Sequence, residues 1–566
     1  MSKFNHESVS GFLKAQGRMM VNGKGEEVIL RGWGAGNWTN PEGFLSGGPE
    51  SVGPIVTEYA VPRRFDRRRS IDSVIRELCG SKYADAFWPQ WYRNHLAEAD
   101  IAEMAKLGYN SVRLPLNAAV FLYEEPGYQF NEDSFAMLDD VLDLCEKYGI
   151  YAILDMHGAV GGQSGLHCDD GIDTVPHLFI DEESAERTIV LWEEIARRYK
   201  DRWIVGGYDL LNEPLSPPKW HHMFPKLREF YDALIPRIRA IDKVHMLSIE
   251  GGAFSSDNSI FFGDTPIDPC NNWCIHIHQY SFSPEIRDLQ QYLERSVALD
   301  VPIWIGEGGS SPEHMSIYYE LCAREHVGFN VWCWKSAQKE TTRVDRGGTR
   351  YPLPKDWELV RNFCDGGPKP GYETSMRIFD ELLENIKFEH CSYSKEAHDY
   401  IQRRPNITLP AVGYDYNPEI GVSFSGNWKF GNPYHFRTED HTKLVLRPGY
   451  TGPTLIVGGM AATTSVMPGA PVSVSALMLE LNADDFASYT IREVKNGCKF
   501  TLELEAPTDA KLVISCGDET IAELTINASD EMLTLDAGIV PAGEEQVVRV
   551  TAVSGTVRLS AVSFTE

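Results

Sequence analysis

Strand-like and helix-like segments alternate from residue 27 to about residue 390. Eight short apolar runs have the character of buried strands, at residues 28–33, 111–114, 151–155, 207–211, 245–249, 273–277, 302–306 and 328–332. Amphipathic helical patterns lie between most of them, at residues 96–107, 132–148, 182–199, 222–241, 284–297, 313–326 and 372–386. The link between the fifth and sixth runs is short of helix. This alternation predicts an α/β fold, a (β/α)8 or TIM barrel.

An insertion separates the first predicted strand from the first predicted helix. It covers about residues 39–90 and holds a Gly/Pro-rich piece and the basic run RRFDRRR at residues 63–69. One interpretation is a loop that covers substrate on the catalytic face of the barrel. For the arginines themselves, we favour a solvated or salt-bridged surface segment, because the chain as a whole is acidic.

The sequence pattern changes after the barrel, which we place at residues 1–395. Residues 396–420 contain Pro405, Pro410 and Pro418, and they are predicted to form a linker. From residue 421 to residue 566, short alternating β segments are separated by turn residues. This pattern is typical of an all-β sandwich domain.

Bulk composition narrows the class of protein. A chain of 566 residues is too long for one compact core, so at least two domains are expected. Its 43% hydrophobic and 24% charged residues are ordinary for a soluble globular enzyme. No apolar run of about 18 residues occurs, so no membrane span is expected. The net charge of -28 argues against nucleic acid or an anionic membrane as a partner.

The cysteines and the first residues bear on the cellular compartment. The 11 cysteines show no repeated spacing, and no second pair completes a zinc site with Cys270 and Cys274. We therefore expect reduced thiols. The start of the sequence shows no apolar segment of the signal-peptide type. Together these features predict a cytoplasmic protein.

Two of the apolar runs end in a single glutamate. Residues 207–211 lead into Asn212, Glu213 and Pro214, and residues 302–306 lead into Glu307 and a glycine. In a barrel of parallel strands, the C-terminal strand ends carry the chemistry. Two glutamates placed there can face each other, one as proton donor and one as nucleophile. The competing interpretation is that each glutamate merely caps a turn.

Other polar residues follow the same rule of position. Arg113, His157, His278, Tyr280 and Trp334 all lie at or near the ends of predicted strands. Taken singly, each has a structural explanation, such as a hydrogen-bonded histidine, an ion-pairing arginine or a core tryptophan. Their collection on the face where barrel enzymes react instead favours one functional site.

With these motifs in place, the chain resembles glycoside hydrolase family 5, a family of retaining (β/α)8-barrel glycosidases. The resemblance covers about residues 27–390. It is carried by Arg113, His157, the triplet Asn212-Glu213-Pro214, the triplet His278-Gln279-Tyr280, Glu307 within Gly-Glu-Gly, and Trp334. Within the family, the motifs at residues 31–38 and 155–165 look most similar to the exo-acting β-glucosidase and β-1,3-glucanase-like branch. The first motif and the 39–90 insertion depart from that branch.

The resemblance assigns the two carboxylates. Glu307 would be the nucleophile, kept ionised by the positive charge of Arg113 and a hydrogen bond from Tyr280. Glu213 would be the acid/base, with a pKa raised by burial and by the negative charge of Glu307. No metal and no organic cofactor is required by this chemistry.

The resemblance also implies substrate contacts. Asn212 is placed to bond the sugar 2-hydroxyl, and His157 and His278 would fix sugar hydroxyls or neighbouring carboxylates. Trp334 would form the stacking floor of the subsite, because a pyranose presents a C–H face to an aromatic ring. The C-terminal sandwich offers few such aromatics, since Trp428 is the only tryptophan after Trp357. We therefore hold a structural role for it at least as plausible as a carbohydrate-binding one.

The sequence thus predicts a retaining glycoside hydrolase that cleaves β-linked glucosides or β-gluco-oligosaccharides with two glutamates. The insertion and the loop at residues 167–170 favour exo action. An endo-acting β-glucanase or mannanase, or a glycolipid-cleaving glycosidase of the same family, remains open. A non-catalytic carbohydrate-binding protein is disfavoured by intact Glu213 and Glu307. A metal-dependent hydrolase would need a larger ligand cluster than His276 and His278 provide.

Overall fold

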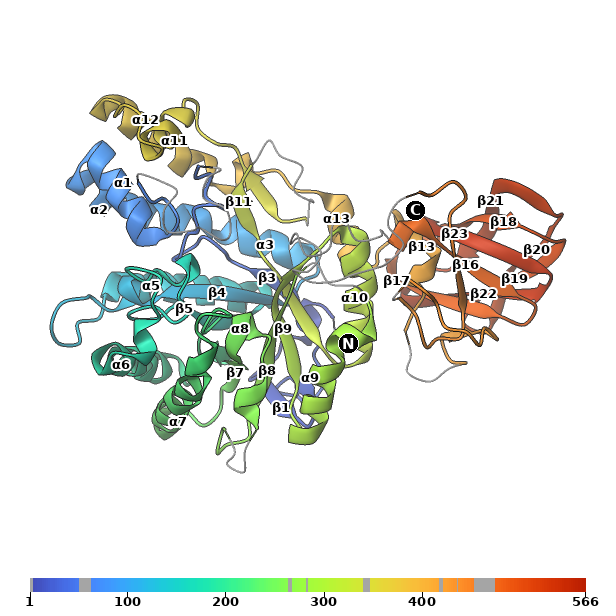
Figure 1. Ribbon diagram of the computed structural model, residues 1–566, viewed down its shortest axis with the longest axis horizontal. Coiled ribbons are helices and arrows are strands. Elements are labelled where there is room, and N and C mark those ends of the chain that lie inside the picture. The colour runs from blue at the N-terminus through green and yellow to red at the C-terminus, as the bar shows by residue number, and fades with distance from the viewer. Residues whose placement is uncertain are drawn as a thin grey trace.

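The computed structural model describes residues 4–49, 63–262, 267–280, 284–338, 347–416, 421–434, 436–451 and 474–566. Eight parallel strands close into a barrel in the order β10-β3-β4-β5-β6-β7-β8-β9, which confirms the predicted fold (Figure 1). The strands are β3 (Arg31–Gly34), β4 (Ser111–Asn117), β5 (Tyr151–Gly158), β6 (Val205–Asp209), β7 (Met246–Glu250), β8 (Trp273–Tyr280), β9 (Ile303–Gly309) and β10 (Gly328–Val331). They are buried almost throughout, which explains their continuous apolar character.

Helices cover the outside of the barrel. They are α3 (Glu98–Lys106), α4 (Ala118–Phe121), α5 (Glu132–Tyr148), α6 (Glu182–Tyr199), α7 (Phe224–Ile241), α8 (Gly252–Ser255), α9 (Ile286–Leu299), α10 (Pro312–Arg324), α11 (Glu358–Cys364) and α12 (Tyr372–Asn385). The connection from β7 to β8 contains the short α8 in place of a long helix, as the sequence indicated. Short sheets pair β1 (Lys14–Gln16) with β2 (Met19–Val21) and β11 (Lys335–Ala337) with β12 (Thr349–Tyr351).

The insertion is more helical than its sequence suggested. It contains α1 (Arg68–Cys79), and α2 (Ser81–His95) extends past its end. Both helices lie beside α11 and α12 at the edge of the barrel (Figure 1). The basic run is salt-bridged, as favoured: Arg67 contacts Asp66 at 3.0 Å, and Arg63 contacts Glu77 at 3.3 Å. It is not wholly a surface segment, because Arg67 and Asp66 are buried and Arg67 donates to the backbone oxygens of Gly171 and Asp173.

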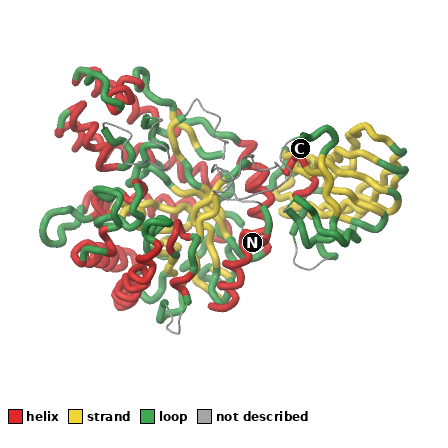
Figure 2. Tube along the Cα trace, in the orientation of Figure 1, coloured by secondary structure: helices red, strands yellow, loops and turns green. Residues whose placement is uncertain are grey.

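The C-terminal part is a sandwich of two antiparallel sheets, which Figure 2 shows as a separate block of strands. One sheet has the order β15-β16-β23-β18-β21 with β13 paired to β23, and the other has the order β14-β17-β22-β19-β20. Their bounds are β13 (Ile407–Pro410), β14 (Phe424–Ser425), β15 (Lys443–Leu446), β16 (Leu477–Asn482), β17 (Phe486–Val494), β18 (Cys498–Ala506), β19 (Ala510–Cys516), β20 (Glu519–Ile526), β21 (Ser529–Val540), β22 (Gly543–Ser554) and β23 (Thr556–Thr565).

The segment expected to be a linker carries secondary structure. Residues 395–402 form α13 (Lys395–Gln402), and β13 adds a strand to the sandwich. Proline is tolerated in β13 because this strand pairs on one side, with β23. The proline spacing therefore marked turns and an edge strand. Ile317 of α10 and Tyr400 of α13 belong to the hydrophobic core of the sandwich, so the two domains share a packed boundary.

A buried ionic cluster lies at this boundary. Arg492 of β17 donates two hydrogen bonds to Glu320 of α10, at 2.7 Å and 2.9 Å. Arg31 lies 3.9 Å from the same carboxylate. The Phe4 ring contacts both guanidinium groups, 4.4 Å from that of Arg31 and 4.5 Å from that of Arg492. The N-terminal segment thus takes part in holding barrel and sandwich together.

Two further expectations concern thiols and membranes. All 11 cysteines are free in the structure. Within the described parts of the chain, none of the helices combines the length and the apolar character needed to cross a bilayer.

Candidate active site

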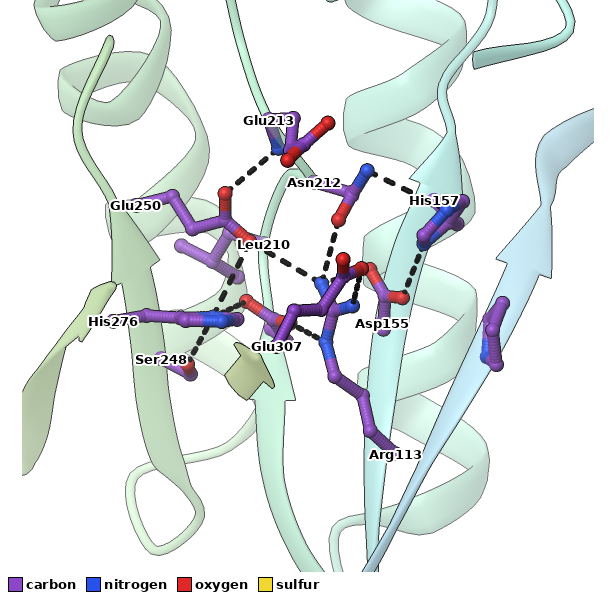
Figure 3. A network of polar contacts seen from close by, with 12 residues as sticks. Arg113, Asp155, His157, Leu210, Asn212, Glu213, Ser248, Glu250, His276 and Glu307 are labelled. Carbon is purple, nitrogen blue, oxygen red and sulfur yellow. Dashed lines mark hydrogen bonds and ion pairs between the residues drawn. The ribbon is translucent and has the colours of Figure 1, made fainter. Parts of the chain in front are cut away.

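Seven of the eight predicted site residues gather at the C-terminal end of the barrel. They are Arg113 on β4, His157 on β5, Asn212 and Glu213 after β6, His278 and Tyr280 on β8, and Glu307 on β9. Parallel pairing brings these positions together although they are far apart in the chain; His278 of β8, for example, lies in register with Glu307 of β9. Figure 3 shows the centre of this cluster.

Arg113 is the hub of the cluster and is fully buried. Its Nη1 donates to Glu307 Oε1 at 2.6 Å, and its Nη2 donates to Asn212 Oδ1 at 2.9 Å (Figure 3). Three more carboxylates surround it: Asp209 at 2.7 Å, Asp155 at 3.0 Å and Glu250 at 3.2 Å. Four carboxylates thus face one guanidinium. Despite burial, their combined charge raises the pKa of Arg113 well above its ordinary value, so it stays charged.

Glu307 has the contacts that a nucleophile needs. Arg113 holds one oxygen, and the hydroxyl of Tyr280 donates to the other at 2.6 Å. Burial is the largest influence and, with the charge of Glu213, raises the pKa of Glu307 above its ordinary value. His278 and Arg113 act against this rise. The predicted contacts of Glu307 are thus present, but the direction of its pKa is opposite to the expectation that they keep it ionised, because burial outweighs them.

Glu213 differs from its prediction in the direction of its pKa. Burial favours the neutral acid, but His278 Nδ1 lies 2.8 Å from Glu213 Oε1, and its hydrogen bond and charge outweigh burial. The net effect lowers the pKa of Glu213, whereas we expected a raised value. The sequence could not show that His278 would pair with Glu213. The counterpart is His278, whose pKa rises well above its ordinary value because the carboxylates, Glu307 first among them, outweigh burial.

The two glutamates are close together. One carboxylate oxygen of Glu213, one of Glu307 and a ring nitrogen of His278 all lie within 4.8 Å of one another. Their exposure differs, since the side chain of Glu213 is 17% exposed and that of Glu307 is 5% exposed. Glu213 is therefore the carboxylate nearer to solvent, and Glu307 is the one set into the barrel.

Comparisons with known proteins agree with this geometry. Residues 75–338 match the family described as Cellulase (glycosyl hydrolase family 5). The barrel thus contains a glycosyl hydrolase family 5 domain over residues 75–338. Among its relatives, a "Beta-xylosidase" of Phanerodontia chrysosporium is 34% identical over 271 residues, 48% of this chain and 52% of that protein. A "Glucan 1,3-beta-glucosidase" of Candida oleophila is 29% identical over 227 residues, 38% of this chain and 48% of that protein. The chain spans about half the length of these relatives.

Solved structures include similar chains at low identity. A crystal structure of endogalactoceramidase has 14% identity and a TM-score of 0.44, and the match covers 97% of this chain and 99% of that one. The rutinosidase from Aspergillus niger has 15% identity and a TM-score of 0.44, over 56% of this chain and 92% of that one.

In this family 5 barrel, His157 and Asn212 support each other. His157 Nδ1 lies 2.7 Å from Asp155 Oδ2, and its Nε2 lies 3.5 Å from the Asn212 amide nitrogen. Burial opposes charging, but Asp155 raises the pKa of His157 above its ordinary value. Of the two roles expected for His157, contact with a neighbouring carboxylate is thus observed.

The prediction for Trp334 was wrong. Its side chain is fully buried, its Nε1 donates to Asp100 at 2.9 Å, and it stacks on Phe388 within the core. The tryptophan at the site is Trp332, which stacks on His157 with ring centroids 5.0 Å apart and 6° between the planes. Near the end of a short strand the chain turns, so counting residues could not decide which of the two rings faces inward.

Two glycines make room for Trp332. A Cβ atom added at Gly34 would lie 2.4 Å from the Trp332 ring, and one added at Gly36 would lie 2.9 Å from it. Both glycines belong to the motif at residues 31–38, so one role of this motif is to leave space for the Trp332 ring. Phe44 and Tyr280 pack against the cluster that Trp332 forms with its neighbours, so the insertion reaches the site.

Sequence reasoning missed several members of the network. They are Asp155, Asp209 and Glu250, together with His276, which was considered only as a possible metal ligand; all four are fully buried. A signal was available: Glu250 directly follows the fifth apolar run, just as Glu307 follows the seventh. An acidic residue at the end of a buried strand is the pattern that identified the two candidate catalytic glutamates, and it applied equally well to Glu250.

Two groups of side chains have the composition of metal ligands. One is Glu250, His276 and His278, and the other is Glu213, His278 and Glu307. Their atoms are engaged with one another and with Arg113, as in the 2.6 Å bond from Arg113 to Glu307. A divalent cation would have to compete with this fixed guanidinium charge. The donor set therefore fits proton chemistry better than metal chemistry.

Proposed function

We propose that the chain is a retaining glycoside hydrolase acting on β-linked glucosides or short β-gluco-oligosaccharides. The observation that carries the proposal is the short distance between the two glutamates, with oxygens within 4.8 Å. Retaining enzymes hold their carboxyl groups about 5 Å apart, whereas inverting enzymes need a wider gap for a water molecule. A gap as small as this one supports direct attack by a carboxylate.

In the proposed mechanism, Glu307 attacks the anomeric carbon while Arg113 and Tyr280 hold its two oxygens. Glu213, the more exposed carboxylate, protonates the leaving oxygen and then activates water. Asn212 is already oriented by Arg113, so its amide group can bond the sugar 2-hydroxyl. Trp332 takes the stacking role, next to His157.

His278 supplies the proton reserve in this proposal. Because its pKa is raised and that of Glu213 is lowered, the free site holds the proton on the imidazole. The ring nitrogen and the carboxylate oxygen are 2.8 Å apart, so the proton can pass to Glu213 without rearrangement. Glu213 can then act as an acid even though its own pKa is low.

Exo action is supported by contacts from the insertion. Glu42 is buried and lies 3.4 Å from His167, which precedes a cysteine in contact with Glu213. The Phe44 ring packs edge-on against His167. These residues close the site on the side where Glu213 lies. Relatives named β-xylosidase and glucan 1,3-β-glucosidase point the same way, whereas those named endoglucanase keep endo action as the alternative.

The deciding experiment follows the anomeric proton by NMR during the first minutes of hydrolysis of an aryl β-glucoside. We expect the β-anomer to appear first, because two displacements retain configuration. Initial release of the α-anomer would rule out the proposed pairing of carboxylates. A parallel panel of aryl β-glycosides and short β-glucans would identify the sugar and distinguish exo from endo action. Glu307→Gln protein serves as the control for contaminating activity.

A further inference from the structure

We propose that Glu250 is a positioning residue for the acid/base: its carboxylate holds the backbone of Glu213 in the conformation that aims the catalytic side chain. The inference rests on the proposed function, because it concerns how Glu213 is made ready to deliver a proton. Glu250 has no place in the eight residues that the sequence picked out. It ends β7, and its side chain is fully buried.

The central contact runs from the Glu213 backbone. The Glu213 N–H donates to Glu250 Oε2 at 2.7 Å (Figure 3). The other oxygen of Glu250 faces Arg113 at 3.2 Å and His278 Nε2 at 3.4 Å. Glu250 therefore reaches Glu213 by two routes, directly at the backbone and indirectly through the imidazole that bonds its carboxylate.

The backbone of Glu213 needs such support. Its φ is 45°, in the left-handed region that residues with a side chain rarely occupy. Pro214 follows, and a residue before proline has even fewer conformations available. A buried N–H must also find an acceptor. The carboxylate of Glu250 satisfies this donor and fixes the unusual turn at the same time.

A simpler explanation would be that Glu250 only balances the charge of Arg113. Asp209 and Asp155 already contact the same guanidinium at 2.7 Å and 3.0 Å. Neither of them is hydrogen-bonded to Glu213, so the contact with the Glu213 backbone distinguishes Glu250 within the described residues. This difference provides the control for the experiment.

The experiment compares Glu250→Gln with Glu250→Asp. Gln keeps an acceptor oxygen at the same reach but loses the charge, whereas Asp keeps the charge but is one methylene too short for the Glu213 N–H. Each variant is assayed on two β-glucosides, one with a 2,4-dinitrophenyl leaving group and one with a methyl group. The first needs little protonation and the second needs it fully.

We expect Glu250→Asp to lower kcat/KM on the methyl glucoside by roughly 10²-fold and on the dinitrophenyl glucoside by less than about tenfold, since general acid catalysis contributes about 10²- to 10⁴-fold. Glu250→Gln keeps the acceptor for the Glu213 N–H but removes a charge that holds the proton on His278, so its loss on the methyl glucoside should be selective but clearly smaller than that of Glu250→Asp. Azide should accelerate turnover of the dinitrophenyl glucoside by Glu250→Asp and give a β-glycosyl azide, because water activation is impaired as well.

Asp155→Asn is the matched control. It removes a carboxylate partner of Arg113 without touching the Glu213 backbone, so its losses should be equal on the two substrates. Equal losses for Glu250→Asp would overturn the proposal and reduce Glu250 to a charge-balancing role. Selective loss in Glu250→Gln with Glu250→Asp unaffected would also overturn it. Failure of the wild-type protein to cleave either glucoside would instead count against the proposed function.

Discussion

Two buried arginine clusters in this molecule have opposite charge balance. At the active site, one guanidinium, that of Arg113, faces four carboxylates and three histidines lie nearby. At the domain boundary, three arginines converge on two buried carboxylates. These boundary residues are Arg31, Arg403 and Arg492 with Glu320 and Asp415.

The difference in charge balance fits a chemical role for the active-site cluster and a structural role for the boundary cluster. A surplus of carboxylates with histidines leaves a proton that can move between groups near neutral pH. A surplus of arginines instead keeps the carboxylate of Glu320 ionised. Burial and Arg492 lower the pKa of Arg31 only to about 9, and Arg492 lowers the pKa of Glu320 despite burial. Asp415 is the exception, because burial raises its pKa above the ordinary value. The ion pair of Arg492 and Glu320 is thus the fixed part of this boundary.

The largest expected effect lies at the carboxylate-rich cluster. Glu307→Gln and Glu213→Gln should each lower the rate about 10³-fold or more, because each removes a chemical step. With an activated leaving group, azide should rescue the Glu213 variant and give a β-azide. Glu307→Ala leaves room for azide at the nucleophile position, so its rescue should give an α-azide by direct displacement. Identical anomers from both variants would contradict the assigned roles.

The second effect lies at the arginine-rich boundary. Glu320→Gln leaves two buried arginines without their shared carboxylate, and breaking such a pair costs about 3–5 kcal/mol. We expect a lower free energy of unfolding, measured by urea denaturation, with kcat on a small aryl glucoside changed less than about twofold. Glu545→Gln is the control, because Glu545 contacts Arg492 at 2.8 Å but is 39% exposed. Its cost should stay below about 1 kcal/mol.

A third pair of variants sharpens the contrast between site and core. Trp332→Ala should lower kcat/KM about tenfold or more, because it removes the ring next to His157, and aromatic stacking is worth about 1 kcal/mol or more. Trp334→Phe removes the hydrogen bond to Asp100 and leaves a cavity in the core, at a cost of about 2 kcal/mol or more in stability, with KM unchanged. A change in KM for Trp334→Phe comparable to that for Trp332→Ala would restore the original assignment.

The smallest expected effect is a shift in the pH profile of kcat/KM. The carboxylates, led by Glu307, raise the pKa of His278 against burial, so its imidazolium persists above the ordinary value of about 6.5. Activity and stability that depend on this proton are complete below pH about 6.5 and are lost as pH rises through the raised pKa. The basic limb of kcat/KM should therefore lie above pH 6.5. A limb at or below that value would show that His278 does not hold the proton.

Sequence alone predicted the barrel and most of the site, because both depend on position along a strand. The ends of the apolar runs located Glu213 and Glu307, and the parallel pairing of strands explains why the two residues lie close together. Contacts made after a strand ends were harder to predict. Which tryptophan faces inward depended on the turn after β10, and the pKa of Glu213 depended on which carboxylate His278 would bond. The helices of the insertion were missed because Gly and Pro residues at its start obscured the amphipathic pattern that follows.

The position of Phe4 between Arg31 and Arg492 has a consequence for the order of folding. Phe4 and Arg31 emerge early in synthesis, and Glu320 follows, but the guanidinium that completes the cluster belongs to β17. Until that strand is made, a barrel that has already formed must leave these groups in water. Contacts between such distant parts of a chain form late and slowly. We therefore expect the boundary to form late in folding, once β17 has been made.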